Sequence, residues 1–193
     1  CLSADLRPIP ADSPKANVNA SIAGTAQAEE AVIANSIPQT SEIDRASAEF
    51  EPTFDGEPEY QDIEGTSLRY VRNSPAPIVR VSENEFYAVH NGVWFTATAV
   101  EGPWTAAVEV PDVVYTIPAS SPLHYITYVR IYDSDEDSVV VGYTPGYYGT
   151  VVSDDVVVYG TGYAYDPWIG SSWYGYPPTW GFGCGITYTP WGG

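Results

Sequence analysis

Apolar and polar residues alternate along the middle of the chain in short runs separated by turn residues. The clearest runs cover residues 67–73, 77–81, 85–90 and 93–100. Such period-two alternation predicts strands that bury one face. Asn91-Gly92 lies between the last two runs and is a strong hairpin signal, because both central residues of a type I′ turn need positive φ. This part of the chain therefore predicts antiparallel β-structure.

Further turn signals extend the β pattern toward residue 158. Glu101-Gly102-Pro103 predicts a second hairpin, followed by strand pattern over 105–118 that a proline interrupts. Residues 123–132 form a long β-type run. The acidic residues at 133–138 predict a turn that connects this run to an antiparallel, valine-rich strand. A further hairpin is predicted around 153–155. We expect a mainly all-β fold, in which antiparallel hairpins form a sandwich or a barrel-like body.

The first 40 residues do not share this pattern. Residues 1–22 are rich in Pro, Ala, Ser, Asp and Asn without periodicity, which predicts disorder unless another surface holds the segment. Residues 24–35 are good helix formers, with Thr25 as N-cap and Pro38 ending the run. The expected organisation is an extended arm with a short helix over 1–40 and a β-rich body over 41–193.

All aromatic residues lie at or after Phe50, and many of them crowd into a tail over 163–193. This tail has too many Gly and Pro residues for regular strands, yet too many aromatic residues for free solution. We expect it to cover a surface, with Trp168, Trp173 and Trp180 as assembly contacts. The same exposed aromatic side chains suit stacking on sugar rings, which is the alternative use.

The charge balance limits the possible partners. Seven basic residues stand against 25 acidic ones, a net charge of −18. Phosphate backbones and anionic lipid surfaces are repelled by such a chain, which argues against a nucleic-acid partner. No run approaches 18 apolar residues, so no membrane span is expected. Because the chain contains no methionine, we expect an export signal to have been removed before residue 1, and an extracellular or cell-surface location.

Two cysteines, Cys1 and Cys184, stand near opposite ends of the chain. An exported chain with an even number of cysteines favours a disulfide, within one molecule or between neighbours. A lipid anchor on Cys1 and two unpaired thiols are the other interpretations. A zinc-type site has too few ligands, since His90 and His124 are the only histidines.

Several phrases of the sequence are distinctive and lie at 37–50, 54–73, 86–97, 102–104, 131–135, 141–152 and 157–170. They resemble a family of exported bacterial proteins that carries the label carbohydrate-binding family V/XII. The resemblance extends roughly from Ile33 to the end and implies export and a β-rich body, without an activity. By likeness to small chitin-binding modules it also implies glycan-facing aromatic residues, which here are Tyr87, Trp94 and Trp104. The chain departs from those modules in its length, its arm and its Gly/Tyr tail.

Two weaker site signals have simpler explanations. Asp133, Asp135 and Asp137 alternate in a tight turn, as in loops that wrap calcium, although a solvated hairpin tip explains the same residues and the turn has no glycine at its bend. Calcium is the only cofactor that the pattern suggests. Asn19-Ala20-Ser21 fits the acceptor pattern for N-glycosylation, which also occurs by chance.

Catalytic signals are weak. No glycine-framed serine or histidine–carboxylate pairing accompanies either histidine. Glu57 and Glu59 lie two apart, a spacing found in any acidic strand. The sequence therefore predicts a protein without enzymatic activity.

We expect a structural subunit of an extracellular filament. In this hypothesis the arm, with its apolar Leu2, Leu6 and Ile9, docks on a neighbouring copy by strand addition, and repetition without closure gives a fibre. The alternative is a monomeric surface protein that binds a glycan through exposed tryptophan and tyrosine side chains.

Overall fold

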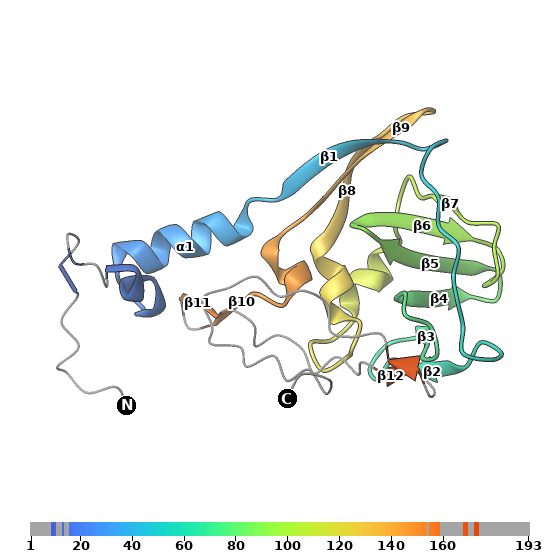
Figure 1. Ribbon diagram of the computed structural model, residues 1–193, viewed down its shortest axis with the longest axis horizontal. Coiled ribbons are helices and arrows are strands. Elements are labelled where there is room, and N and C mark those ends of the chain that lie inside the picture. Colours follow the sequence, from blue (N-terminus) through green and yellow to red (C-terminus); the bar gives the residue numbers. More distant parts are fainter. Residues whose placement is uncertain are drawn as a thin grey trace.

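The computed structural model describes residues 9–10, 13, 16–153, 155–158, 168–169 and 172–173. These residues form a mainly β protein, which confirms the expected fold class. Two antiparallel sheets build the body: one of six strands in the order β2-β3-β4-β5-β6-β7 and one of three in the order β1-β9-β8 (Figure 1). The arrangement is sandwich-like.

The six-stranded sheet is an antiparallel meander, because its strands are neighbours both in sequence and in space. The strands are β2 (Tyr60–Asp62), β3 (Arg69–Val71), β4 (Ile78–Ser82), β5 (Glu85–His90), β6 (Val93–Ala97) and β7 (Thr105–Ala106). The β5–β6 turn has φ of 51° at Asn91 and 77° at Gly92, and His90 pairs with Val93. The hairpin predicted at Asn91-Gly92 is thereby confirmed.

The three-stranded sheet joins distant parts of the sequence. The hairpin of β8 (Val129–Ser134) and β9 (Ser138–Tyr143) closes at the acidic turn, as predicted. The other edge of β9 pairs with β1 (Gln39–Asp44), in a register that runs from Gln39 opposite Tyr143 to Asp44 opposite Ser138. In Figure 1 these strands rise above the six-stranded sheet.

The central strands β5 and β6 of the six-stranded sheet are covered on both faces. Alternate residues of β5 and β6, such as Phe86 and Phe95, face a cluster that includes Val139 and Val141 of β9. The intervening residues face a second cluster, which includes Val114, Ile126 and, at the start of β8, Val129. A sheet covered on both sides explains why its aromatic side chains are core residues.

The strand pattern predicted over 105–118 and 123–132 is wrong in part. Only Thr105–Ala106 joins the sheet, and the chain then forms two 3₁₀-helices, η2 (Asp112–Thr116) and η3 (His124–Tyr128), before β8. Val114 and Ile126 are fully buried on these helices. Packing across the face of the sheet overrides the β preference of these apolar runs.

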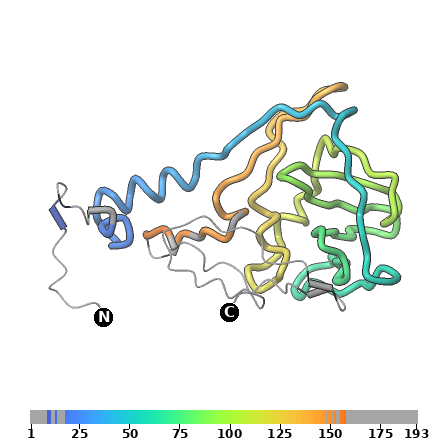
Figure 2. The backbone as a smooth tube through the Cα atoms, viewed as in Figure 1, coloured from blue at the N-terminus to red at the C-terminus, as the bar shows by residue number. Residues whose placement is uncertain are grey.

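The N-terminal part contains η1 (Ala16–Ser21) and α1 (Ala26–Ser36). Thr25 caps α1 by accepting a hydrogen bond from the amide of Ala28 at 3.2 Å, so the predicted helix and its cap are confirmed. Both helices lie at the far end of the molecule from the six-stranded sheet (Figure 2). Within the described ranges, no helix has the length and apolarity that a membrane crossing requires.

The remaining elements are short. After β9 the chain forms η4 (Pro145–Tyr148), and the hairpin of β10 (Val151–Ser153) and β11 (Val156–Val158) confirms the last predicted hairpin. In the tail, β12 (Trp168–Ile169) pairs with β13 (Ser172–Trp173).

The burial of Tyr87 should make the stability of the folded protein depend on pH in the alkaline range. Desolvation, together with the hydrogen bond that its phenol donates to Glu85 at 3.1 Å, raises the pKa of Tyr87 to about 12. Between about pH 10 and 12 the unfolded chain therefore loses a proton that the folded chain keeps, so the free energy of unfolding should fall over this interval. Urea denaturation at pH 8, 10 and 11 measures this. Tyr87→Phe should give a shallower decline above pH 10, and equal declines in both proteins would contradict the assignment.

Candidate functional site

The outer edge of β9 is the place where the N-terminal segment joins the body. The first four side chains of β1, from Gln39 to Glu42, are exposed, and Ile43 is half-buried against the core. Main-chain pairing with β9 therefore holds β1 more than apolar burial does. We use "arm" below for residues 16–44, which extends the predicted arm to the end of this strand.

Gly142 of β9 is the point of closest approach between the arm and the body. It lies opposite Thr40 of β1 and Arg130 of β8. A Cβ atom at Gly142 would come within 2.7 Å of the Gln39 carbonyl oxygen and 2.9 Å of the Tyr132 ring. No real Cβ tolerates such contacts with a backbone atom, so β1 can pair here only because this residue is glycine.

Arg45 fastens the end of β1 to the β8–β9 turn. Its amide donates to the Asp137 carbonyl at 2.9 Å, and its guanidinium donates to the carbonyls of Glu136 at 2.8 Å and Asp135 at 3.2 Å. The Asp135 carboxylate accepts from the Ser138 amide at 2.6 Å and the Asp137 amide at 2.9 Å. These hydrogen bonds lower the pKa of Asp135.

The acidic turn is organised by its own amides. Asp133 accepts from the amide of Ser134, and Asp135 accepts from two further turn amides. Across the described ranges, no group of three or more Asp, Glu, His or Cys side chains is placed to hold a metal ion. The carboxylates of Asp133 and Asp135 thus cap amides of the turn, and the calcium site expected from Asp133, Asp135 and Asp137 stays a prediction.

The predicted glycosylation site is engaged inside the N-terminal part. Asn19 is 1% exposed, its side-chain nitrogen donates to the Ile9 carbonyl at 2.7 Å, and its oxygen accepts from the Ile9 amide at 2.9 Å. A glycan on this nitrogen would displace those contacts. Ile9, predicted as an assembly contact, is half-buried there.

The helical part of the arm contacts β11 but leaves apolar side chains uncovered. Ala28 of α1 and Val157 of β11 are buried, at 0% and 4% exposure. Val18, Ile33 and Ile37 are 51%, 61% and 61% exposed. These three apolar side chains are available for a further contact.

The three residues expected to face a glycan lie in the core. Tyr87, Trp94 and Trp104 are 7%, 0% and 9% exposed. The indole nitrogens donate to main-chain carbonyls, from Trp94 to Val129 at 3.0 Å and from Trp104 to Val100 at 3.1 Å. The expectation of exposed stacking faces is wrong, because the elements that cover the two faces of the sheet come from distant parts of the sequence.

Some predicted residues lie outside the described part of the chain: Cys1, Leu2, Leu6, Trp180 and Cys184. The backbones of Trp168 and Trp173 pair across β12 and β13, and their side chains also lie outside the described part.

The two histidines and Glu59 have contacts with neighbouring segments. The His124 Nδ1 atom lies 2.7 Å from the Ile117 carbonyl oxygen, and the His90 ring lies 5.5 Å from that of Phe50. The Glu59 carboxylate is 3.5 Å from Arg72. These contacts tie the residues to neighbouring segments.

Sequence reasoning missed Gly142 and Arg45. A glycine within the valine run of β9 is a known sign of close backbone approach and could have been noticed. Arg45 carried no comparable sign, because its partners are main-chain carbonyls about 90 residues away.

Comparisons of the chain with protein-family models, with curated proteins and with solved structures find no match.

Proposed function

We propose that the protein is a non-enzymatic structural subunit that assembles by giving its arm to a neighbouring copy. In the assembly, β1 of one copy would extend β9 of the next, as it extends β9 of its own chain in the structure. The observation that carries the proposal is the attachment of β1, an edge strand held by main-chain pairing with most of its side chains exposed.

Exchange between copies would keep the contacts that the arm already makes. An exchanged element forms the same interface with its neighbour, so only the link to the body has to change conformation. That link, residues 46–49, lies between Arg45 and the buried Phe50 and is mostly exposed. If each copy gives its arm to the next copy and receives one from the copy before it, the assembly does not close and forms a fibre.

The apolar residues of the arm favour a second copy as the partner. Val18, Ile33 and Ile37 remain exposed when the arm lies on its own chain. Packing against a neighbour would remove such side chains from water, which stabilises by about 25 cal/mol per Å². Because each copy carries 18 net negative charges, assembly should strengthen as salt screens their repulsion.

The resemblance described above implies export, and we place the assembly outside the cell. The alternative of a glycan-binding monomer has less support, because the aromatic residues implied for it are core residues. Assembly through the arm requires no exposed aromatic surface on the sheet.

Cysteine crosslinking between two differently labelled copies tests the exchange. Glu42 of β1 lies opposite Val140 of β9, at a backbone separation that a disulfide can bridge. One chain would carry Glu42→Cys and the other Val140→Cys, both with Cys1→Ser and Cys184→Ser. If arms are exchanged, mixing and mild oxidation should give covalent dimers on a non-reducing gel.

The matched control replaces Val140→Cys with Glu51→Cys, an exposed position outside β9. This pair should give only the background of random crosslinks. A chain that carries both Glu42→Cys and Val140→Cys shows whether the arm closes on its own body. Monomeric crosslinks from that chain, with no excess of dimers in the mixture, would contradict the proposal.

A further inference from the structure

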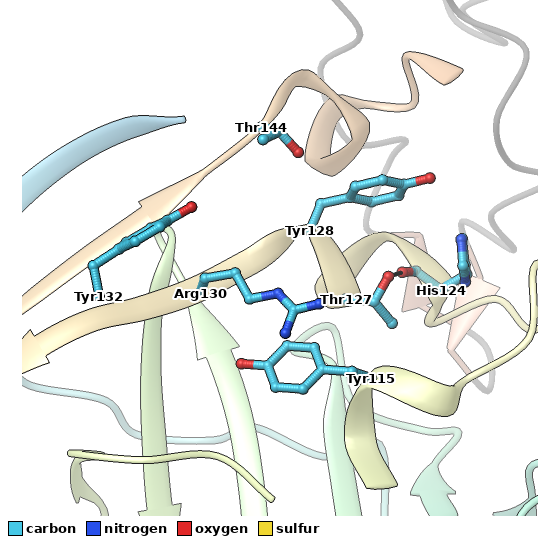
Figure 3. A pocket seen from close by; sticks show the side chains of 7 residues that line it. All are labelled: Tyr115, His124, Thr127, Tyr128, Arg130, Tyr132 and Thr144. Atoms are coloured by element: carbon cyan, nitrogen blue, oxygen red, sulfur yellow. Dashed lines mark hydrogen bonds between the residues drawn. The ribbon is translucent and has the colours of Figure 1, made fainter. Parts of the chain in front are cut away.

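A second feature of the fold is a cavity of about 320 Å³ between the 3₁₀-helices and β8. Ligand pockets in proteins begin at about this size. Its walls are mainly tyrosine rings and threonine hydroxyls around one arginine (Figure 3). The lining residues are Tyr115, His124, Thr127, Tyr128, Arg130, Tyr132 and Thr144.

Arg130 provides the positive charge of this cavity. The central carbon of its guanidinium lies 3.6 Å from the centroid of the Tyr115 ring, which is a cation–π contact. Arg69 and Arg72 form ion pairs with carboxylates at 2.9 and 3.5 Å, whereas Arg130 forms no ion pair with any described residue. Arg130 is exposed to solvent, so a carboxylate can reach its guanidinium and accept two hydrogen bonds from it.

The phenol of Tyr115, next to the Arg130 guanidinium, also favours an anionic ligand. Burial raises the pKa of Tyr115, and the nearby charge of Arg130 only partly opposes this rise. The phenol therefore keeps its proton at neutral pH. It adds a hydroxyl that can donate to an anion without adding a negative charge to the cavity.

The aromatic wall is held in place by close packing. A Cβ atom at Gly146 would lie within 2.4 Å of the Tyr128 ring, so the ring rests directly on the backbone of η4. Tyr128 also meets His124 edge to face, with centroids 5.4 Å apart. Tyr132 is 49% exposed and borders the cavity on the solvent side. A ligand ring would find the packed ring of Tyr128 and the accessible ring of Tyr132 beside the cation.

We propose that this cavity binds a small ligand with a single carboxylate on a six-membered ring. The carboxylate would lie at the edge of the Arg130 guanidinium, and the ring would lie against Tyr128 and Tyr132. One negative charge matches the one arginine that lines the cavity, whereas a polyanion would be repelled by the 18 net negative charges of the chain. The ring would be that of an aromatic acid or of a sugar acid, since an aromatic ring and the C–H face of a pyranose both pack against tyrosine.

Titration of the full-length protein with benzoate and with galacturonate, followed by ligand-observed NMR, tests this site. At least one of them should bind with Kd of about 1 mM, the affinity expected for so small a ligand. Their neutral counterparts benzamide and galactose should bind at least about 10-fold more weakly, because they cannot form charge-assisted hydrogen bonds. The tighter of the two acids identifies the type of ring. Acetate, which has no ring, should also bind more weakly than that acid.

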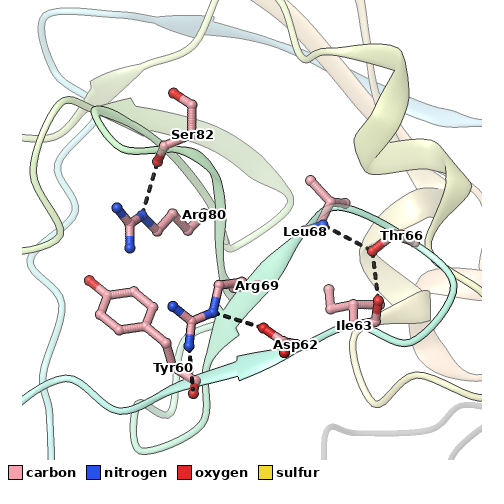
Figure 4. A network of polar contacts seen from close by, with 8 residues as sticks. All are labelled: Tyr60, Asp62, Ile63, Thr66, Leu68, Arg69, Arg80 and Ser82. Atoms are coloured by element: carbon pink, nitrogen blue, oxygen red, sulfur yellow. Dashed lines mark hydrogen bonds and ion pairs between the residues drawn. The ribbon is translucent and has the colours of Figure 1, made fainter.

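Arg130→Gln should weaken binding of that acid by about 10-fold or more. Arg80→Gln is the matched control, because Arg80 also lies near aromatic rings, 5.4 Å from the Tyr60 centroid, but does not line the cavity (Figure 4). The Arg80 guanidinium donates to the Ser82 carbonyl at 3.0 Å. This control should leave Kd unchanged.

Tyr132→Ala removes an exposed side chain and should weaken binding of the same acid while the circular dichroism spectrum stays unchanged. The proposal is overturned if neither acid binds below about 20 mM, far weaker than the affinity expected above. Equal binding of acid and neutral counterpart, or equal losses in Arg130→Gln and Arg80→Gln, would overturn it as well. None of these results depends on whether the arm is exchanged.

Discussion

Replacing Trp94 by alanine should destabilise the folded body by about 3–5 kcal/mol, the range found when large aromatic side chains are removed from cores. The side chain is 0% exposed and meets the rings of Tyr87 and Tyr115 edge to face, each with centroids 6.5 Å apart. Its indole also donates to the Val129 carbonyl at 3.0 Å, which ties β6 to the start of β8. Urea denaturation followed by circular dichroism measures the loss.

Trp94→Phe separates packing from hydrogen bonding. It retains an aromatic ring but leaves the Val129 carbonyl without its donor, so we expect an intermediate loss. The matched control is Val152→Ala, at a side chain that is 50% exposed, which should change stability by less than about 0.5 kcal/mol. A loss below about 1 kcal/mol for Trp94→Ala would show that Trp94 does not anchor the core.

Gly142→Val should release β1 from β9. Its first side-chain atom would already lie 2.7 Å from the Gln39 carbonyl oxygen and 2.7 Å from a methyl carbon of Thr40. Because the oxygen belongs to the backbone, relief requires β1 to move. Hydrogen exchange should therefore show loss of amide protection over residues 39–44 while the β5–β6 hairpin keeps its protection.

The same variant tests the proposed assembly. If copies join through β1 and β9, Gly142→Val should remain near the 20.9 kDa of one chain in light scattering at concentrations where the unchanged protein forms larger species. Val140→Thr is the control, since it nearly conserves side-chain volume two residues away on the same strand. Unchanged protection of residues 39–44 in Gly142→Val would contradict the role of Gly142.

The two variants act on different parts of the molecule. Trp94 belongs to β6 and packs in the second core cluster, whereas Gly142 lies on β9, where the arm meets the body. Gly142→Val should leave the second core cluster intact, and Trp94→Ala should destabilise the body that carries the β9 edge. Measuring stability and arm protection on both variants therefore distinguishes a detached arm from a generally weakened protein.

Local signals in the sequence determined much of the secondary structure. Asn91-Gly92 was sufficient to predict the β5–β6 hairpin, because its positive φ angles are a property of those two residues. Thr25 and Pro38 likewise marked the limits of α1 to within two residues, because capping and the loss of an amide donor act within one turn. The class of fold followed from these signals and from period-two alternation.

Only the tertiary structure decided which surfaces are buried and which strands are neighbours. Tyr87 and Trp94 occupy positions that would be solvent-facing in a one-sided sheet, but η2, η3 and the start of β8 cover that face. Likewise, nothing local in residues 39–44 indicates pairing with residues 138–143. Alternation specifies that a strand has two faces, whereas long-range contacts determine what covers each face and which edge remains open.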